Sequence, residues 1–145
     1  MRPTSLAIRP FVAADAEACV RIFDRAWHSG HPYAPRVIDK AVLATETEAE
    51  TLFIAEDEAS EIAGFVSLYE PQDFIHHLFV DPRFQGRGIG GALLDHAVAF
   101  AGGAATLKCQ LRNEAALAFY KNRGWTEVTA GTGEFGEWIA LRSPG

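Results

Sequence analysis

Four glycines crowd the stretch LFVDPRFQGRGIGGALL, at positions 86, 88, 90 and 91, between an apolar run that ends at Val80 and an amphipathic segment. Glycine allows unusual backbone dihedral angles and lets a ligand approach the main chain closely. The first free N–H groups of a helix and its positive dipole end both favour an anion. Arg87 can add a direct positive charge. The stretch therefore predicts a helix entry that binds phosphate.

The letters GRGIGG also satisfy the dinucleotide fingerprint GxGxxG, so a flavin or nicotinamide enzyme is a competing interpretation. That fingerprint belongs in the first strand-to-helix turn, with an acidic residue about 20 positions later. Here several strand-like runs come first, and the segment after the helix carries Lys108 and Arg112 instead. A P-loop is excluded because no GxxxxGK followed by Ser or Thr occurs.

His76 and His77 are adjacent in an apolar run and are candidate general bases, because an unperturbed imidazole has a pKa of about 6.5. Adjacent strand residues point to opposite faces, so both rings share one cleft only if a β-bulge intervenes. In the alternative interpretation, one histidine is packed and the other simply lines a polar surface. Glu70 and Asp73 are weaker candidates for the base.

The elements that must position these residues can be read from periodicity and turn signals. In the N-terminal half we expect a strand over residues 6–9, a helix over 13–27, a breaker-rich loop SGHPYAP and a second helix over 36–45. The first helix has an apolar face at Ala16, Cys19, Val20, Phe23 and Trp27, with Asp15 near its start. The face expected for the second is Val37, Ala41 and Ala44. His28 and His31 are assigned to the loop, which extends from Trp27 to Pro35 and includes Tyr33.

An antiparallel meander of three strands should follow, over residues 51–56, 61–69 and 73–80. Residues 88–100 then read as a helix whose inward side is Ile89, Ala92, Leu93, Ala97 and Phe100. A strand over 106–111, a helix over 114–123 and strands over 125–129 and 135–141 complete the chain. Asn113 suits the N-cap of that last helix, and Gly124 suits its left-handed C-terminal position.

The resulting order, βααβββαβαββ, predicts one α+β (mixed α/β) domain over residues 1–145. Its central sheet should be mixed and mostly antiparallel, with about seven strands and with helices on both faces, because the unit 73–111 requires a parallel crossover. A hydrophobic fraction of 48% over 145 residues is sufficient for one core.

Charge and cysteine content narrow the partners. The net charge is −6, so no broad basic surface can neutralise nucleic acid. We interpret the acidic run as a solvated helix end and turn rather than a cation-recruiting rim; it comprises Glu46, Glu48, Glu50, Glu56, Asp57, Glu58 and Glu61. Cys19 and Cys109 lack metal-ligand spacing and read as buried apolar residues, and no metal site is expected. Without an apolar signal segment or spanning helix, we expect a cytoplasmic protein with no membrane partner.

A family resemblance now adds to this interpretation. Gln85, Gly88 and Gly90 match the Q/R-x-x-G-x-G/A signature of the GNAT acetyltransferases, and the LFVDP lead-in is similar to the family's fourth strand. The stretch LKCQLRNEAALAFYKNRGW resembles the strand and helix that follow, including the Asn cap and the Phe-Tyr pair. The strong similarity covers residues 73–129, and the IRPF opening agrees more weakly. The resemblance implies a GNAT-like fold and an N-acetyltransferase that uses acetyl-CoA.

The resemblance also assigns roles. Leu78, Phe79 and Val80 resemble the strand edge that pairs with pantetheine, and the pyrophosphate-binding stretch is Gln85, Gly86, Arg87, Gly88, Ile89, Gly90 and, as a further contact, Gly91. Asn113 matches the helix-cap position near the pantetheine, and Tyr120 matches the general acid that protonates the thiolate. His76 and His77 are the leading candidates for the base.

The acceptor is expected to be a primary amine of a small molecule or peptide, which attacks the acetyl thioester directly. The acidic balance slightly favours a cationic amine. We allow for a homodimer. Two alternatives stay open, an acyl-CoA-binding sensor without turnover and the nucleotide-binding oxidoreductase.

Overall fold

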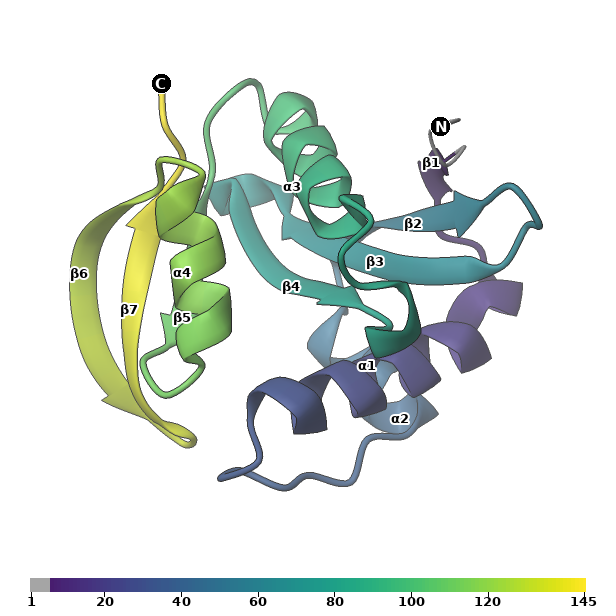
Figure 1. The fold of residues 1–145 in the computed structure, drawn as a ribbon, viewed down its shortest axis with the longest axis horizontal. Helices are drawn as coiled ribbons and strands as arrows, with labels where there is room; N and C mark the ends of the chain where they lie inside the picture. Colours follow the sequence, from purple (N-terminus) through teal and green to yellow (C-terminus); the bar gives the residue numbers. More distant parts are fainter. Residues whose placement is uncertain (1–5) are drawn as a thin grey trace.

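The computed structural model describes residues 6–145, which form one seven-stranded sheet with helices on both faces (Figure 1). The strands are β1 (Leu6–Pro10), β2 (Thr51–Asp57), β3 (Ile62–Tyr69), β4 (Phe74–Val80), β5 (Thr106–Gln110), β6 (Thr126–Gly133) and β7 (Gly136–Arg142). Their spatial order is β1-β2-β3-β4-β5-β7-β6, and every neighbouring pair is antiparallel except β4 and β5. The predicted fold class and the parallel crossover are therefore confirmed.

The helices divide between the two faces of the sheet. Helices α1 (Ala16–Gly30) and α2 (Lys40–Glu46) lie on one face, and α3 (Ile89–Phe100) and α4 (Glu114–Asn122) lie on the other (Figure 1). A hydrophobic core lies on each face of the sheet, and alternate residues of β2 pack into one or the other. Ile54 packs with α1, whereas Phe53 packs with α3. This alternation is the period of two that a strand buried on both faces requires.

The parallel pair β4 and β5 is joined at one end only. Phe74 pairs with Thr106 and Ile75 with Leu107, and no further pairing between the two strands follows within residues 6–145. The strands then separate, which leaves the β5-facing edge of the second half of β4 without a strand partner. Since α3 connects the two strands, its N-terminus lies beside this opening (Figure 1).

The structure corrects the ends of several predicted elements. Helix α1 continues to Gly30, so His28 lies on the helix and not in the loop where we expected it. Asp15 does not cap α1; it is buried and accepts two hydrogen bonds from Arg9, both 2.8 Å long. Strand β6 extends to Gly133, because its residues continue to pair with β7, and Gly131 lies against the Trp138 ring, where a Cβ would collide. Glycines that resembled a turn are therefore strand residues.

The side of the second helix that we expected to be buried is the wrong one. Helix α2 begins at Lys40, where the Asp39 side chain accepts a hydrogen bond from the Val42 N–H (2.9 Å). Leu43 is its buried residue, whereas Val37 precedes the helix and is 85% exposed. Ala41 and Ala44 are also exposed.

The inward side of α3 was predicted in part, because the buried Leu94 was not among the predicted residues and Ala92 is only partly buried. Ile89, Leu93 and Ala97 are buried as expected, but Phe100 is half exposed at the last turn, with its ring against Phe53. Across the part of the chain that the structure describes, none of the helices is both long and apolar enough to cross a bilayer.

Candidate active site

A cleft of about 900 Å³ opens where β4 and β5 separate. It is bounded by the second half of β4, the start of α3, one side of α4 and the end of α1. Nearly every site residue predicted from the sequence lines it, namely His76, His77, Leu78, Phe79, Val80, Gln85, Gly86, Gly88, Ile89, Gly90, Gly91, Asn113 and Tyr120. Arg87 is the exception; its guanidinium lies 5.2 Å from the Phe84 ring centroid.

The entry to α3 has the backbone of an anion site. Gly86 and Gly88 have φ angles of 82° and 79°, in the left-handed region that side chains rarely adopt. Gly88 is the N-cap of α3 and carries no capping side chain, and the first helical hydrogen bond there joins the Ala92 N–H to the Gly88 carbonyl (3.1 Å). The N–H groups before Ala92 in this turn therefore have no intrahelical acceptor. A Cβ added at Gly86 or Gly88 would meet no atom within 4 Å, so the space over these residues is open.

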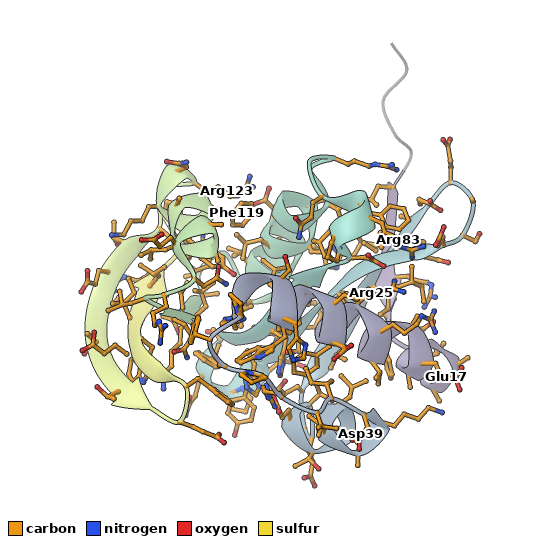
Figure 2. The ribbon with its side chains drawn as sticks, turned by 60° about the horizontal axis from the view of Figure 1, so that its bottom comes forward. Glu17, Arg25, Asp39, Arg83, Phe119 and Arg123 are labelled. Carbon is orange, nitrogen blue, oxygen red and sulfur yellow. The ribbon has the colours of Figure 1, made fainter. Side chains whose placement is uncertain are left out.

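The next two glycines lie where α4 packs against the start of α3. A Cβ at Gly91 would lie 2.7 Å from a guanidinium nitrogen of Arg123, which also donates two 2.9 Å hydrogen bonds to Asp95. A Cβ at Gly90 would touch Val80 and Phe119 at 3.5 and 3.7 Å. Figure 2 shows Arg123 and Phe119 next to each other at α4. Gly91 therefore lets Arg123 of α4 approach the start of α3 closely, whereas Gly90 has room for a Cβ at ordinary contact distance.

Asn113 and Tyr120 both face the cleft from α4. The Asn113 side chain accepts a hydrogen bond from the Ala116 N–H (3.3 Å), as predicted for an N-cap, and it lies against Gly30 at the end of α1. Tyr120 is packed between Phe119 and Trp125, and its hydroxyl has no hydrogen-bond partner among the described residues. Burial raises the pKa of Tyr120 well above its usual value, so its hydroxyl is a proton donor at neutral pH.

A bulge in β4 brings the two histidines together. Ser67 of β3 pairs with His77 and Leu68 pairs with Ile75, so His76 is the extra residue. The two imidazole centroids are 3.9 Å apart, and both residues line the cleft. The sequence made a shared cleft conditional on a bulge, and the structure contains that bulge.

His77 is fixed by its surroundings on every side. It is 95% buried, its Nδ1 lies 2.8 Å from Ser67 Oγ, and its Nε2 lies 3.0 Å from a Glu46 oxygen. Because Ser67 Oγ already accepts the His77 backbone N–H, its hydroxyl proton is free to be donated to Nδ1. Nε2 then carries the ring proton and donates it to Glu46. Burial lowers the pKa of His77, although Glu46 opposes this shift, so the neutral ring offers no free lone pair.

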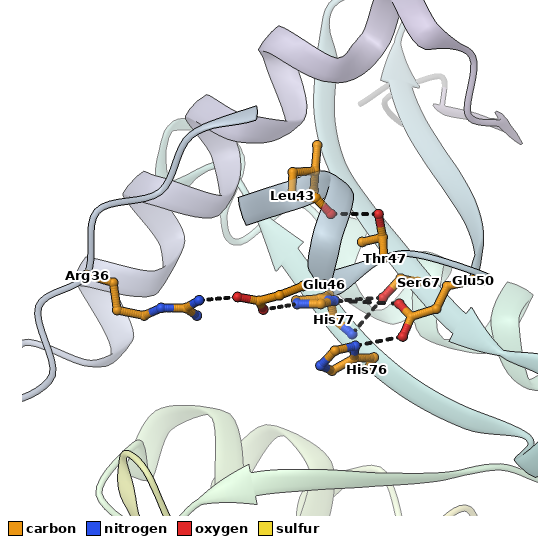
Figure 3. A network of polar contacts seen from close by, with 8 residues as sticks. All are labelled: Arg36, Leu43, Glu46, Thr47, Glu50, Ser67, His76 and His77. Carbon is orange, nitrogen blue, oxygen red and sulfur yellow. Dashed lines mark hydrogen bonds and ion pairs between the residues drawn. The ribbon is translucent and has the colours of Figure 1, made fainter. Parts of the chain in front are cut away.

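His76 has the opposite arrangement. Its Nδ1 lies 2.7 Å from a carboxylate oxygen of Glu50, and its side chain is 37% exposed toward the cleft. A carboxylate accepts only, so Nδ1 must carry the proton and Nε2 keeps its lone pair. Figure 3 shows this pair beside the chain of contacts that joins His77, Glu46 and Arg36. The two adjacent histidines therefore have different chemistry.

The sequence profile of the Acetyltransferase (GNAT) family matches residues 16–125. The chain belongs to this family. N-alpha-acetyltransferase RimI of Mycobacterium tuberculosis is 26% identical over 130 residues, which are 85% of this chain and 80% of that protein. The chain is an acyltransferase of the GNAT type, as the sequence resemblance predicted.

Two solved structures resemble this GNAT chain in fold. A GCN5-related N-acetyltransferase from Rhodopseudomonas palustris has a TM-score of 0.81 at 24% identity, over 99% of this chain and 98% of that one. The PaiA N-acetyltransferase of Thermoplasma acidophilum, solved in complex with coenzyme A, has a TM-score of 0.79 at 16% identity, over 97% and 99%. These likenesses support the fold of the GNAT domain.

Glu46 and Glu50 are parts of this GNAT site that sequence reasoning missed, because they were interpreted as members of a solvated acidic run. Their side chains are only 25% and 8% exposed. Burial alone would raise the pKa of Glu46, but hydrogen bonds from His77 and Arg36 outweigh it and lower the pKa to about 2. The only available signal was their spacing of four residues next to a predicted helix end.

The opposite end of the cleft from α3 is lined by groups that suit an acceptor. Arg36 lies among three aromatic rings, with its guanidinium carbon 4.7 Å from the Trp27 ring centroid and 5.0 Å from that of Phe135. Trp27 and His31 line the cleft as predicted, but His28 and Tyr33 do not. His28 instead binds backbone groups of Asp24 and Arg36.

The two weaker candidates for the base lie away from the cleft. Glu70 belongs to a short 3-10 turn and contacts the Thr51 hydroxyl, and Asp73 has a φ of 48° at the end of that turn. Neither residue is part of the cleft lining.

Proposed function

We propose that this GNAT protein transfers the acetyl group of acetyl-CoA directly to a primary amine of a small molecule or peptide. The observation that carries the proposal is that one cleft combines three features. These are the open N-terminus of α3, the strand edge of β4 that lacks a partner, and the hydroxyl of Tyr120. The first suits a pyrophosphate, the second an amide-containing arm, and the third a leaving thiolate.

The cleft has suitable donors for acetyl-CoA along its length. Backbone N–H groups between Gln85 and Gly91 would hold the pyrophosphate, where the left-handed glycines leave open space. Arg87 would add positive charge at the rim. The edge of Leu78, Phe79 and Val80 would pair with the pantetheine amides and polarise the acetyl carbonyl. The coenzyme A bound by PaiA, a protein of the same fold, supports this assignment.

The proton transfers follow from the two histidine environments and from Tyr120. His76 Nε2 would take a proton from the incoming ammonium, with Glu50 stabilising the imidazolium through Nδ1. The amine nitrogen then bonds to the acetyl carbon, the carbon–sulfur bond breaks, and the new amide nitrogen releases its second proton to solvent, from which Tyr120 is later reprotonated. Tyr120 would donate its proton to the departing sulfur, because its hydroxyl is protonated and free of other partners in the described chain. His77 would hold the local geometry and would not take the proton.

The charge at the acceptor end favours a cationic amine. Arg36 offsets the charge of Glu46 there, but Glu50 adds a carboxylate beside His76, and the chain carries a net charge of −6. RimI, a relative over 85% of this chain, is an N-alpha-acetyltransferase, which makes a peptide amine a reasonable member of the class.

We further propose a cytoplasmic location, supported by Cys19 and Cys109, both buried and unpaired. The homodimer stays a prediction.

Release of CoA across a panel of amines tests the proposed function. The panel should contain peptides with free α-amines, lysine-containing peptides blocked at the N-terminus, polyamines and single amino acids. We expect acetyl-CoA-dependent release with at least one cationic amine and none with the matched acetamides. Tight acetyl-CoA binding without release for any amine would instead favour an acyl-CoA-binding module. Thermal stabilisation by NAD or FAD, but not by acetyl-CoA, would favour the oxidoreductase.

A further inference from the structure

The acceptor end of the cleft holds a cluster of metal-ligating side chains. Glu46, His76 and His77 each offer one ligand atom, and these three atoms all lie within 4.8 Å of one another. The bulge in β4 is what makes this arrangement available, because an undistorted strand would direct the two imidazoles to opposite faces. Two histidines and a carboxylate are a common ligand set for zinc.

Glu50 lies outside this group of three ligands and supports it as a buried carboxylate with an unused oxygen. The Glu50 side chain is 92% buried, and its Oε1 has no hydrogen-bond partner in the described chain. This oxygen lies 3.9 Å from His77 Nδ1, while the other carboxylate oxygen holds His76. A buried carboxylate oxygen without a donor is costly. A cation bound at the neighbouring imidazoles would offset part of this cost.

The neighbouring contacts orient these ligands. Arg36 binds one oxygen of Glu46, which leaves Oε1 facing His77 Nε2. Ser67 Oγ lies 2.8 Å from His77 Nδ1 and can accept its proton when Nε2 is needed as a lone pair. A hydrogen bond at the second imidazole nitrogen is the usual support for a metal-bound histidine. Figure 3 shows these supporting residues around the cluster.

The ligand types and spacing favour zinc over a hard cation. Imidazole nitrogens suit Zn²⁺, Co²⁺ or Ni²⁺, whereas Mg²⁺ and Ca²⁺ prefer oxygen ligands. Tetrahedral zinc with bonds of about 2.0–2.1 Å holds its ligand atoms about 3.4 Å apart. The cluster must therefore contract when it binds zinc, and His76 is its most exposed member.

We infer that Glu46, His76 and His77 form an inhibitory site for a zinc-class divalent cation, in which Glu50 orients His76 through its Nδ1. A metal bound there occupies the lone pair of His76, so no base remains to take the proton of the amine substrate. The α3 end of the cleft stays accessible to acetyl-CoA. Metal binding itself is independent of the proposed function. The effect on turnover rests on it.

Calorimetric titration of the whole chain with ZnCl₂, in the absence of acetyl-CoA and acceptor, tests the site. We expect one Zn²⁺ per chain, with affinity at least about tenfold weaker in His76→Ala and in Glu46→Gln. His96→Ala is the matched control, because His96 is on α3 against Phe53, outside the cluster, and this variant should bind as the wild type does. MgCl₂ should give no binding. Co²⁺ bound to the wild type should show the visible absorption of a tetrahedral site, and His76→Ala should lose this absorption. A substitution that only altered stability would not change the coordination spectrum in this way.

The result that would overturn the inference is the absence of Zn²⁺ binding, or equal affinity in wild type and His76→Ala. A second arm separates it from the proposed function: Zn²⁺ should leave acetyl-CoA affinity within about twofold while it stops CoA release. If no amine supports turnover but the His76-dependent zinc site is present, the proposed function fails and the metal site stands. If turnover occurs and zinc does not bind, the proposed function stands and the metal site is refuted.

Discussion

Replacement of Tyr120 by Phe should lower kcat about 100-fold while leaving the protein as stable as the wild type. In this structure the Tyr120 hydroxyl makes no hydrogen bond to the described chain, and its ring contacts Phe119 and Trp125, contacts that Phe can keep. The variant therefore loses no internal hydrogen bond, which would otherwise cost about 1 kcal/mol. A 100-fold loss corresponds to about 2.7 kcal/mol in the transition state alone. A thiolate is a fairly good leaving group, so the effect should lie at the lower end for acid catalysis.

The assay measures CoA release and the denaturant midpoint on the same preparation, together with acetyl-CoA affinity by calorimetry. The acid role predicts a large fall in kcat with a near-constant midpoint and an affinity within about twofold. Unchanged turnover, or a fall in stability that accounts for the loss of activity, would refute the reasoning and leave Tyr120 as a packing residue.

Four further substitutions test the rest of the account. His76→Ala should lower kcat by about 10²-fold or more, whereas His77→Gln should mainly lower the denaturant midpoint; equal small effects on turnover would contradict the assignment. Asp15→Asn should cost about 2–3 kcal/mol near pH 7, because it breaks the pair with Arg9. Arg9 holds the pKa of Asp15 below its ordinary value of 3.8, so this contribution is present above about pH 4 and is lost as the pH falls further; urea midpoints of both proteins from pH 7 to 2.5 should converge. Gly64→Ala should cost about 1–3 kcal/mol by thermal unfolding, because its Cβ would lie 2.7 Å from a carbonyl oxygen of β4; an unchanged midpoint would contradict that packing.

The parts of the fold predictable from sequence are those with strong local periodicity. The meander strands, α3 and α4 have apolar runs bounded by turn residues. The glycines before α3 fit one structural role, a helix entry that a ligand can approach closely. The boundaries that failed are set by tertiary contacts. Gly131 is a strand residue because it pairs with Trp138 of β7, and α2 buries Leu43 because α1 packs against it.

The candidate site was predictable where backbone geometry creates it and not where distant side chains meet. The residues of the α3 entry and Tyr120 follow from motif and spacing. Glu46 and Glu50 instead lie 31 and 26 positions before the histidines they contact. Their approach depends on how α2 packs on the sheet and on a one-residue bulge, and neither leaves a periodic signal in the sequence.

The central claim, that the entry to α3 binds the pyrophosphate of acetyl-CoA, is tested most directly by a pair of glycine substitutions. Gly88 and Gly102 both have left-handed φ angles, 79° and 90°, and both have open space where a Cβ would lie, but only Gly88 lines the cleft. Alanine at either position should therefore cost a similar amount, about 1–2 kcal/mol, of stability. Calorimetry with acetyl-CoA should show binding at least about tenfold weaker for Gly88→Ala and unchanged for Gly102→Ala. Wild-type affinity in a folded Gly88→Ala variant would contradict the account.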